Sequence, residues 1–198
     1  DVLVAAWSPF GTFFAAVGKG KDLNILDCSS EDPSKWKPTA TLECIQAGLA
    51  LAWGPTASEG LQYFAYGGFA RTVTVIEIRT HEKAWETVLV LNQEDTVFDL
   101  DWSRDGMLAV GLGDGTVSII DLAYLLSGQA VNQMDYNWQR QGVTCITEIR
   151  RVQTKKAITS LRWMENNASG DLLLVVGGSD GIVEIIDLTE RKLCRGFQ

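Results

Sequence analysis

Two carboxylates, Asp99 and Asp101, have the spacing of a possible catalytic pair. They alternate with apolar residues in a strand-like run, so both side chains lie on one side of the strand. Paired carboxylates in that arrangement could carry out general acid–base chemistry. The surrounding sequence predicts no pocket, however. A position on the surface or along a channel is therefore the alternative interpretation of this pair.

The run from Asp99 to Gly106 also resembles a calcium-binding loop. The glycine is displaced from the position where such a loop turns, and the twelfth position is Val110, whose apolar side chain cannot bind a cation. We therefore reject a calcium site.

No other set of residues has the spacing of a catalytic or metal centre. His81 is the only histidine, so neither a zinc site nor a His-based triad can be assembled. The glycine-rich run 111–115 precedes a strand-like run and no Lys-Ser/Thr follows it, which argues against a phosphate-binding loop. We predict no catalytic, cofactor-binding or metal-binding residues, and we predict that the chain is not an enzyme.

An internal repeat supplies the elements that position these residues. Each copy has an apolar run ending in tryptophan, a turn, an apolar run ending in glycine, a third run ending in Asp or Glu, and a fourth run. The first runs of the four copies end at Trp7, Trp53, Trp102 and Trp163. The runs are short and rich in Val, Ile and Leu, which is typical of strands. A repeat that cannot bury both faces alone must stack on its copies.

The other tryptophans precede the fourth run of the first three copies: Trp36, Trp85 and Trp138. We expect both sets to fill the gaps between stacked sheets, because the indole ring is large and mostly apolar. A stacking platform for a ligand is the alternative for the second set.

Three segments resemble the WD-repeat β-propeller family: Ala-Trp-Ser-Pro-Phe-Gly at 6–11, Trp-Ser-Arg-Asp-Gly at 102–106 and Gly-Ser-Asp-Gly at 178–181. The resemblance covers nearly the whole chain. It departs from the family where the tryptophan of the Trp-Asp dipeptide is replaced by Leu26, Ile76, Ile120 and Ile186, and where the Gly-His dipeptide is absent. The hydrogen-bond network that the family builds on that histidine therefore cannot be carried over.

The resemblance implies an all-β fold, a WD-repeat-type β-propeller with four blades of four antiparallel strands. We expect a single partial propeller over 1–198, with blades at about 1–46, 47–92, 93–152 and 153–198. The family usually closes with more blades, so we expect an open partial ring that further blades complete. A closed four-bladed ring is the alternative. Because the chain opens at Asp1 directly on a strand-like run, we expect it to be part of a longer protein.

The function implied by the resemblance is that of a non-catalytic protein-interaction scaffold, a platform for assembling a multiprotein complex. Its partners would be other proteins or peptide segments, with no cofactor and no small-molecule substrate. The alternative is a regulatory or targeting propeller of a larger enzyme or membrane-trafficking protein, whose active domain lies outside this chain.

The composition indicates which classes of molecule the chain can bind. The net charge is −8, which disfavours binding to a phosphate backbone. A basic segment at 147–162 leaves nucleic acid as a minor alternative. No apolar run is long enough to cross a membrane.

The four cysteines, Cys28, Cys44, Cys145 and Cys194, show no regular spacing. We interpret them as free thiols in a reducing compartment, with disulfides as the alternative, and expect an intracellular protein, cytoplasmic or nuclear.

The partner face is predicted on one rim of the propeller, where corners between second and third strands meet the links between blades. An exposed Phe-Ala-Arg corner there combines an aromatic ring with a guanidinium, two groups enriched at binding hot spots. The predicted protein-binding residues on this rim are Phe69, Arg71, Glu94, Asp95, Lys155 and Lys156. An ordinary hydrophilic rim is the alternative.

Two further hypotheses concern the third and fourth copies. The 123–141 insertion has a high apolar content for a loop, and we predict that Tyr136 and Trp138 bind protein there, unless the loop folds back onto its own blade. Counted from the tryptophans, Asp101 and Arg162 occupy equivalent positions in adjacent copies. We predict that they form an ion pair between blades, with two solvated channel residues as the alternative.

Overall fold

The computed structural model describes residues 1–44, 46–56, 60–82, 84–122, 144–150, 156–166, 171–188 and 192–197. For 144–150, 165, 166, 171 and 192–197 it describes the backbone alone. Within these ranges the chain forms sixteen β-strands and one short 3-10 helix, η1 (Pro33–Lys35).

The strands form four antiparallel sheets, each of four consecutive strands in sequence order. The first sheet contains β1 (Val2–Trp7), β2 (Phe13–Gly18), β3 (Asp22–Asp27) and β4 (Lys37–Glu43). The second contains β5 (Gly48–Trp53), β6 (Leu61–Gly68), β7 (Thr72–Arg79) and β8 (Ala84–Asn92). The third contains β9 (Val97–Trp102), β10 (Met107–Leu112), β11 (Thr116–Asp121) and β12 (Thr144–Arg150). The fourth contains β13 (Ile158–Asn166), β14 (Asp171–Gly178), β15 (Val183–Asp187) and β16 (Lys192–Phe197). The prediction of an all-β chain with four sheets of four strands is confirmed, whereas the residue limits given for the blades stay a prediction.

In the third and fourth sheets a tight corner with glycine in the left-handed region joins the second strand to the third. Gly115 and Gly181 have φ of +86° and +80°, which an L side chain rarely adopts. The aspartate before each glycine supports the corner, because the carboxylates of Asp114 and Asp180 accept hydrogen bonds from the backbone N–H two residues on, at 2.9 and 3.0 Å. The Asp-Gly pairs therefore fix where the second strands of these two sheets reverse.

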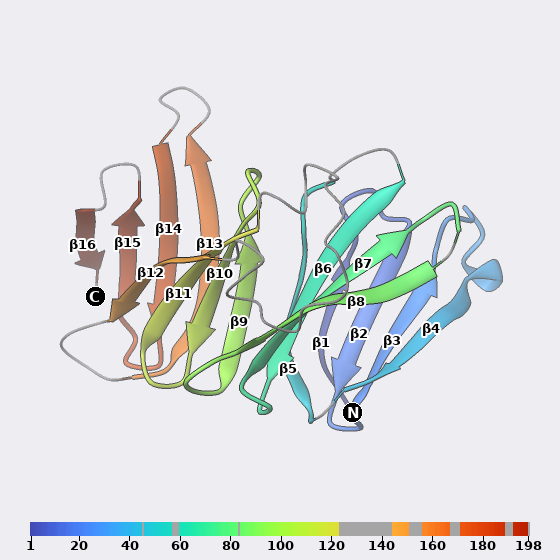
Figure 1. Cartoon of the computed structure of the whole chain (residues 1–198), viewed down its shortest axis with the longest axis horizontal. Helices are drawn as coiled ribbons and strands as arrows, with labels where there is room; N and C mark the ends of the chain where they lie inside the picture. Colours follow the sequence, from blue (N-terminus) through green and yellow to red (C-terminus); the bar gives the residue numbers. More distant parts are fainter. Residues whose placement is uncertain are drawn as a thin grey trace.

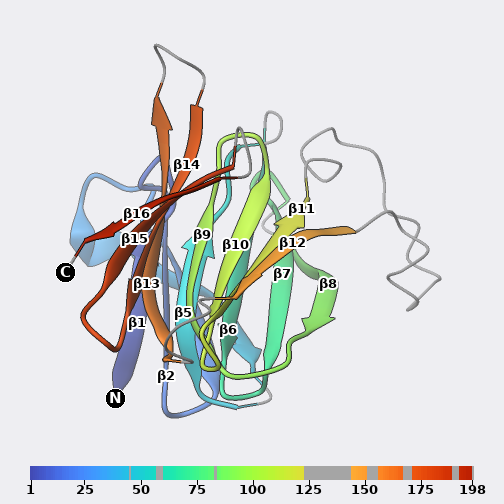
Figure 2. The same ribbon diagram turned by 90° about the vertical axis from the view of Figure 1, so that its left-hand side faces the viewer.

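The sheets stack in chain order through their first strands. β1 contacts β5, β5 contacts β9, and β9 contacts β13. The first sheet, in blue, lies at one end of the stack and the fourth, in orange and red, at the other (Figure 1). Seen from the fourth-sheet side, β13 to β15 lie in front of the other sheets (Figure 2). β1 and β13 make no comparable contact within the described residues, so the ring is open, and the alternative of a closed four-bladed ring is wrong.

The same two rows of side chains meet at each of the three interfaces between sheets. One row, the tryptophan row, pairs the tryptophan of the first strand with Phe or Leu of the second and Leu or Ile of the third. Its members are Trp7–Phe14–Leu26, Trp53–Phe64–Ile76, Trp102–Leu108–Ile120 and Trp163–Leu174–Ile186. The alanine row lies one residue earlier in the first strand, on the opposite face. Its members are Ala6–Ala15–Ile25, Ala52–Ala65–Val75, Asp101–Ala109–Ile119 and Arg162–Val175–Ile185.

Each tryptophan row packs against the alanine row of the preceding sheet, and these contacts form the three hydrophobic cores. Phe64 and Ile76 are buried against Ala15 and Ile25 between the first two sheets. A small residue opposite a large ring lets the sheets approach closely, which is favourable because interiors are close-packed. The indole N–H of Trp53 donates to the Ala6 carbonyl at 3.1 Å. The Trp163 N–H donates in the same way to the Asp101 carbonyl, also at 3.1 Å.

Candidate protein-interaction site

The β6–β7 corner carries two of the predicted residues on the surface of the second sheet. Phe69 is 51% exposed, which is high for a large aromatic residue. Arg71 has φ of +56°, and its N–H donates to the Gly68 carbonyl at 3.2 Å. This is the position that glycine occupies in the third and fourth sheets, so an arginine here carries a conformational cost. The corner therefore presents an aromatic ring and a guanidinium to solvent at a strained backbone position.

The link from β8 to β9 holds Arg71 from the other side. The Arg71 carbonyl accepts a hydrogen bond from the Gln93 N–H at 2.8 Å. The Arg71 guanidinium lies 3.9 Å from the Asp95 carboxylate, and the same Asp95 oxygen accepts the Thr96 N–H at 2.7 Å. Glu94, which precedes Asp95 in the chain, is exposed. The structure thus brings Arg71 and Asp95 into contact, with Glu94 as the chain neighbour of Asp95.

The third sheet supports this link through the β10–β11 corner. The Gly113 N–H donates to the Thr96 carbonyl at 2.9 Å. A Cβ at Gly113 would lie 3.2 Å from both the Asp95 carboxylate and the Phe98 ring, closer than almost all real Cβ contacts. Gly113 therefore lets the third sheet approach Asp95, which is held between two corners.

The remaining predicted residues are not brought to this group. Lys156 is exposed just before β13 and forms no ion pair with any described residue. Lys155, Tyr136 and Trp138 lie outside the described residues, as does the 123–141 insertion.

A small hollow beside the Phe69 corner was not predicted from the sequence. It lies between the link from β4 to β5 and the β6–β7 corner, and its lining is uncharged. The lining residues are Gln46, Ala47, Gly48, Tyr66, Gly67, Gly68, Ala70, Thr72 and Thr74. A Cβ at Gly68 would collide with the Ala47 carbonyl, so the Gly67-Gly68 pair was the signal that two backbones meet here.

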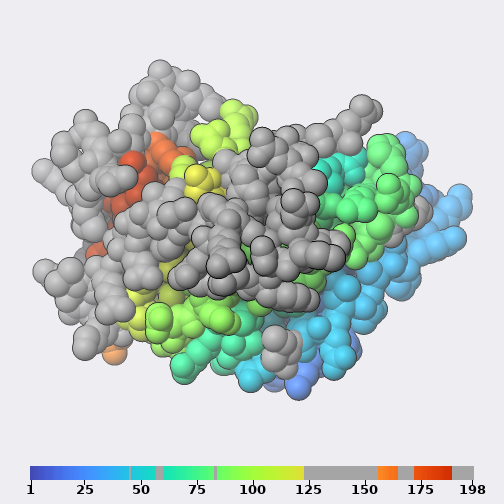
Figure 3. Space-filling model, in the orientation of Figure 1, coloured from blue at the N-terminus to red at the C-terminus, as the bar shows by residue number. Residues whose placement is uncertain are grey.

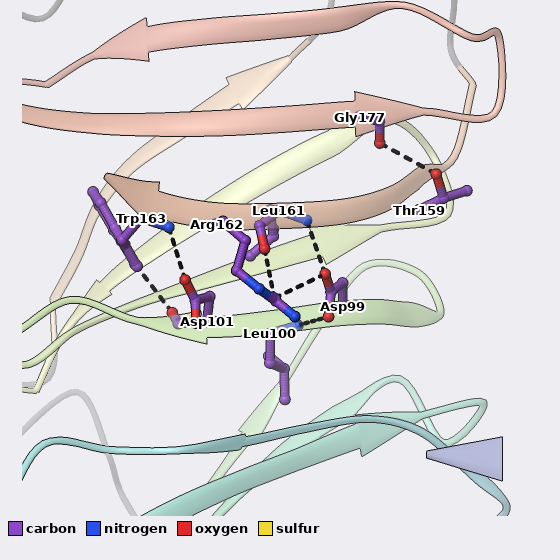
Figure 4. Close-up of polar contacts among 8 residues, drawn as sticks. All are labelled: Asp99, Leu100, Asp101, Thr159, Leu161, Arg162, Trp163 and Gly177. Atoms are coloured by element: carbon purple, nitrogen blue, oxygen red, sulfur yellow. Dashed lines mark hydrogen bonds and ion pairs between the residues drawn. The ribbon is translucent and has the colours of Figure 1, made fainter. Parts of the chain in front are cut away.

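The Asp99 and Asp101 carboxylates join the third sheet to the fourth (Figure 4). Asp99 accepts the N–H of its neighbour Leu100 at 3.0 Å and the N–H of Leu161 in β13 at 2.8 Å. Asp101 accepts the N–H of Trp163 at 2.7 Å. These bonds satisfy backbone groups at the inner edge of β13, which has no strand partner on that side. The bonds give both carboxylates a structural role between the third and fourth sheets.

The predicted ion pair between Asp101 and Arg162 is wrong. Arg162 pairs with Asp99 at 3.4 Å and donates to its neighbour's carbonyl, that of Leu161, at 2.7 Å. The Asp101 carboxylate is instead directed at the Trp163 N–H. The arginine side chain runs along the edge of β13 and reaches Asp99, two residues before Asp101 in β9. Counting equivalent positions from the tryptophans does not predict this contact.

Burial raises the pKa of both carboxyls above the usual value. For Asp99 the desolvation is opposed by the Leu161 N–H, the Arg162 charge and the Leu100 N–H. For Asp101 it is opposed by the Trp163 N–H and Arg162, while the Asp99 charge raises the pKa further. Loss of water thus outweighs the hydrogen bonds at both positions.

On the second sheet an ion-pair cluster surrounds Arg79, at the end of β7. Its guanidinium lies 2.9 Å from Glu77, 3.4 Å from Glu86 and 3.7 Å from Glu82. The Tyr63 hydroxyl also donates to Glu77, at 3.2 Å. Among the residues described here, no group of His, Cys, Asp and Glu side chains is arranged to hold a metal ion. No described helix is long and apolar enough to cross a membrane.

The stacked four-stranded sheets define the class of the protein as a partial β-propeller. Residues 70–166 match the family model of the anaphase-promoting complex subunit 4 WD40 domain, over a segment that includes Arg71, Asp95 and Lys156. A comparison with curated proteins gives no match. The matched segment and the repeated sheets support a WD-repeat family, as the sequence predicted. WD40 domains are typically non-catalytic modules that mediate contacts between proteins, so the general function is that of a protein-interaction scaffold.

Proposed function

We propose that the chain is a non-catalytic platform that helps to assemble a multiprotein complex, and that the rim between the second and third sheets binds a partner protein or peptide. The observation that carries this proposal is the Phe69–Arg71 corner, where an exposed ring lies two residues from an exposed guanidinium that pairs with Asp95 at 3.9 Å. Aromatic and arginine side chains are both enriched at hot spots.

The matched family supports the assembly role, because its name is that of a subunit of a larger complex. The composition of the rim supports a protein partner, since it combines the exposed Phe69 ring with side chains of both charges, Arg71 against Asp95 and Glu94. Exposed Glu94 belongs to this face. Lys155 and Lys156 stay predicted contributors to the same rim, and Tyr136 and Trp138 stay a separate predicted binding element on the 123–141 insertion, which the sequence places on the opposite rim. The buried free thiols of Cys28 and Cys44 support an intracellular, reducing location.

The test is affinity purification of the tagged chain from extracts of its source cells, followed by mass spectrometry. The variants are Phe69→Ser and Arg71→Gly, and Val90→Ser is the control, because Val90 is an exposed apolar residue on the outer strand β8. Glycine is the informative replacement at Arg71, since it removes the guanidinium while keeping the left-handed backbone unstrained.

The proposal expects a reproducible set of proteins with the parent chain and the Val90 variant, and loss of that set with both rim variants. If the rim variants retain every partner while the Val90 variant loses them, the binding face lies elsewhere. Unchanged melting of each variant shows that a loss is not caused by unfolding.

A further inference from the structure

The corner between the second and third strands has a residue with positive φ at the same position in all four sheets. This residue is glycine in the third and fourth sheets, but it is Lys21 in the first (φ +64°) and Arg71 in the second (φ +56°). Its carbonyl accepts the N–H of the link to the next sheet, from Cys44 at 2.6 Å in the first case and from Gln93 at 2.8 Å in the second. A cation where glycine costs less, at two adjacent corners, indicates that both side chains have a function.

The links that follow these two corners correspond residue by residue. Three residues after the bonded N–H, the carbonyl of Ala47 in the first link accepts an N–H of the next corner at 3.4 Å. The carbonyl of Thr96 in the second link does the same at 2.9 Å. Because both ends of the links match, the residues just before these carbonyls are equivalent. They are Gln46 in the first link and Asp95 in the second.

The two equivalent positions differ in charge. Asp95 lies 3.9 Å from the Arg71 guanidinium, so the corner of the second sheet has an anion from its own chain. Lys21 is exposed and forms no ion pair with any described residue, and the equivalent position in the link beside it carries the neutral amide of Gln46. The corner of the first sheet therefore has no counterpart of the Asp95 carboxylate.

The position of Gln46 adjoins the small hollow beside Phe69. Gln46 lines this hollow together with uncharged residues of β5, β6, β7 and the β6–β7 corner. Two of these residues, Tyr66 and Thr74, carry hydroxyl groups that hydrogen-bond to each other. The hollow has room for about one small polar group. Segments of the first sheet, in blue, and of the second, in teal, lie side by side along the lower edge of the molecule, where these corners are (Figure 3).

We propose that the rim over the first and second sheets binds an acidic segment of a partner protein. One carboxylate of this segment lies beside Lys21 at the hollow, in the place that Asp95 takes beside Arg71. A second carboxylate competes with Asp95 for Arg71, since an exposed ion pair at 3.9 Å is weak. This assignment rests on the function proposed above, because it names the chemistry of the partner at the same rim.

The charges around the two cations favour a short acidic segment over a nucleic acid. Asp22, which follows Lys21, and its cross-strand partner Glu43 are both exposed. Exposed Glu94 precedes Asp95 in the second link. The rim therefore has no continuous positive field of the kind that binds a phosphate backbone. A single carboxylate needs only one cation at contact distance.

The test selects peptides from a random display library on the immobilised chain and measures the affinity of the enriched peptides by fluorescence anisotropy. The proposal expects enrichment of Asp and Glu, and loss of binding when the acidic residues of a selected peptide are replaced by Asn and Gln. Selection of no peptide, or of peptides without acidic residues, would overturn it.

Replacements at Gln46 test where the carboxylate binds. Gln46→Glu supplies the missing anion with almost no change in size, so it should weaken binding about fivefold, and Gln46→Lys should strengthen binding by a similar factor. Lys21→Gly removes the ammonium group without straining the backbone and should weaken binding as Gln46→Glu does. The control is Lys35→Gln, which changes the net charge by the same amount as Gln46→Glu, in η1 at the other end of β3.

Binding by the Gln46→Glu variant as tight as by the parent would overturn the position beside Lys21. Equal losses for Gln46→Glu and Lys35→Gln would overturn it too, because net charge alone would then explain them. Melting of each variant identifies any that fails to fold, and Gln46→Asp replaces Gln46→Glu if that variant does not fold.

The same peptides separate this proposal from the function on which it rests. Selected peptides that lack acidic residues but no longer bind the Phe69→Ser variant would overturn the acidic chemistry and leave the rim as the partner face. Acidic peptides that bind the Phe69→Ser, Lys21→Gly and parent chains equally would count against the rim itself, and so against both proposals.

Discussion

The Asp99 carboxylate accepts the backbone N–H of Leu161 across the boundary between the third and fourth sheets, at 2.8 Å. No other interface between the sheets can form this contact, because the residue three before the tryptophan is Val4 in the first sheet and Ala50 in the second. The inner edge of β13 is thus held by side chains of β9 at Asp99 and Asp101.

Replacing Asp99 by alanine should lower the free energy of unfolding by ~1–3 kcal/mol, because the Leu161 N–H loses its acceptor in a partly buried place. Asp99→Asn keeps an acceptor oxygen and should cost less. Urea unfolding measures both. The control is Asp105→Ala, at an exposed turn position, where a change within about 0.5 kcal/mol is expected. Equal losses for Asp99→Ala and Asp105→Ala would contradict the role of this bond.

The Arg162 contact should contribute much less than the backbone bond. Its side chain is 65% exposed and lies 3.4 Å from Asp99, so a double-mutant cycle of Asp99→Ala with Arg162→Ala should give a coupling below about 1 kcal/mol. The coupling should fall further in high salt. A larger coupling that is independent of salt would mean that Arg162 is the main partner of Asp99.

Because the pKa values of Asp99 and Asp101 are raised in the folded chain, the free energy of unfolding should depend on pH in a defined direction. The folded chain binds their protons more tightly than the unfolded chain, so their contribution is fully present below the usual pKa of 3.8 and is lost as pH rises through the raised folded-state pKa. Unfolding of the parent and of the Asp99→Asn, Asp101→Asn double variant should be measured over that window. The parent should lose stability relative to the variant as pH rises. The opposite slope would show that hydrogen bonding outweighs burial.

Gly48 lies where the second sheet packs against Val17 of the first. A Cβ there would lie 2.7 and 2.8 Å from the two methyl groups of Val17, which is too close without movement. Gly48→Ala should destabilise the chain by ~1–3 kcal/mol through overpacking. Val17→Ala removes both methyl groups, so the double variant should be less destabilised than the sum of the two single variants. Additive losses in thermal melting would locate the strain elsewhere.

The indoles of Trp53 and Trp102 should respond differently to phenylalanine. Trp53 donates to the Ala6 carbonyl, whereas the buried Trp102 N–H has no hydrogen-bond partner in the described part of the chain. Both variants lose a similar area of buried ring. Trp53→Phe should lower the free energy of unfolding by ~1 kcal/mol more than Trp102→Phe, because only Trp53 also loses a hydrogen bond. Chemical unfolding of the two variants provides the comparison, and equal losses would show that the Trp53 bond contributes nothing.

The fold could be predicted from the sequence because its signals are local. A strand ending in Trp7 or Trp102, an Asp-Gly corner at 114–115 or 180–181, and the repeat of both define the sheets without long-range information. The surface corner at Phe69 could also be predicted, since a turn flanked by strands places its residues in solvent.

The contacts between sheets could not be predicted in the same way. The partner of Arg162 depends on how far its side chain reaches along β9, and a long flexible chain reaches two residues away as easily as one. The positive φ of Arg71 could not be predicted from its residue type, because glycine is the residue that usually indicates positive φ. The hollow beside Phe69 lies between the link into β5 and the β6–β7 corner, two segments that come together only when β5 pairs with β6.

The carboxylates of β9 also mean that the four repeats are not equivalent modules. In a chain built from identical copies of the third repeat, Asp99 and Asp101 would face a strand whose own aspartates already engage the Leu100 and Trp102 N–H groups. The guanidinium of Arg162 would be missing, and anionic charge would accumulate along the first strands of the sheets. Shuffling or duplicating these repeats in protein engineering therefore has to keep the third and fourth together as a unit.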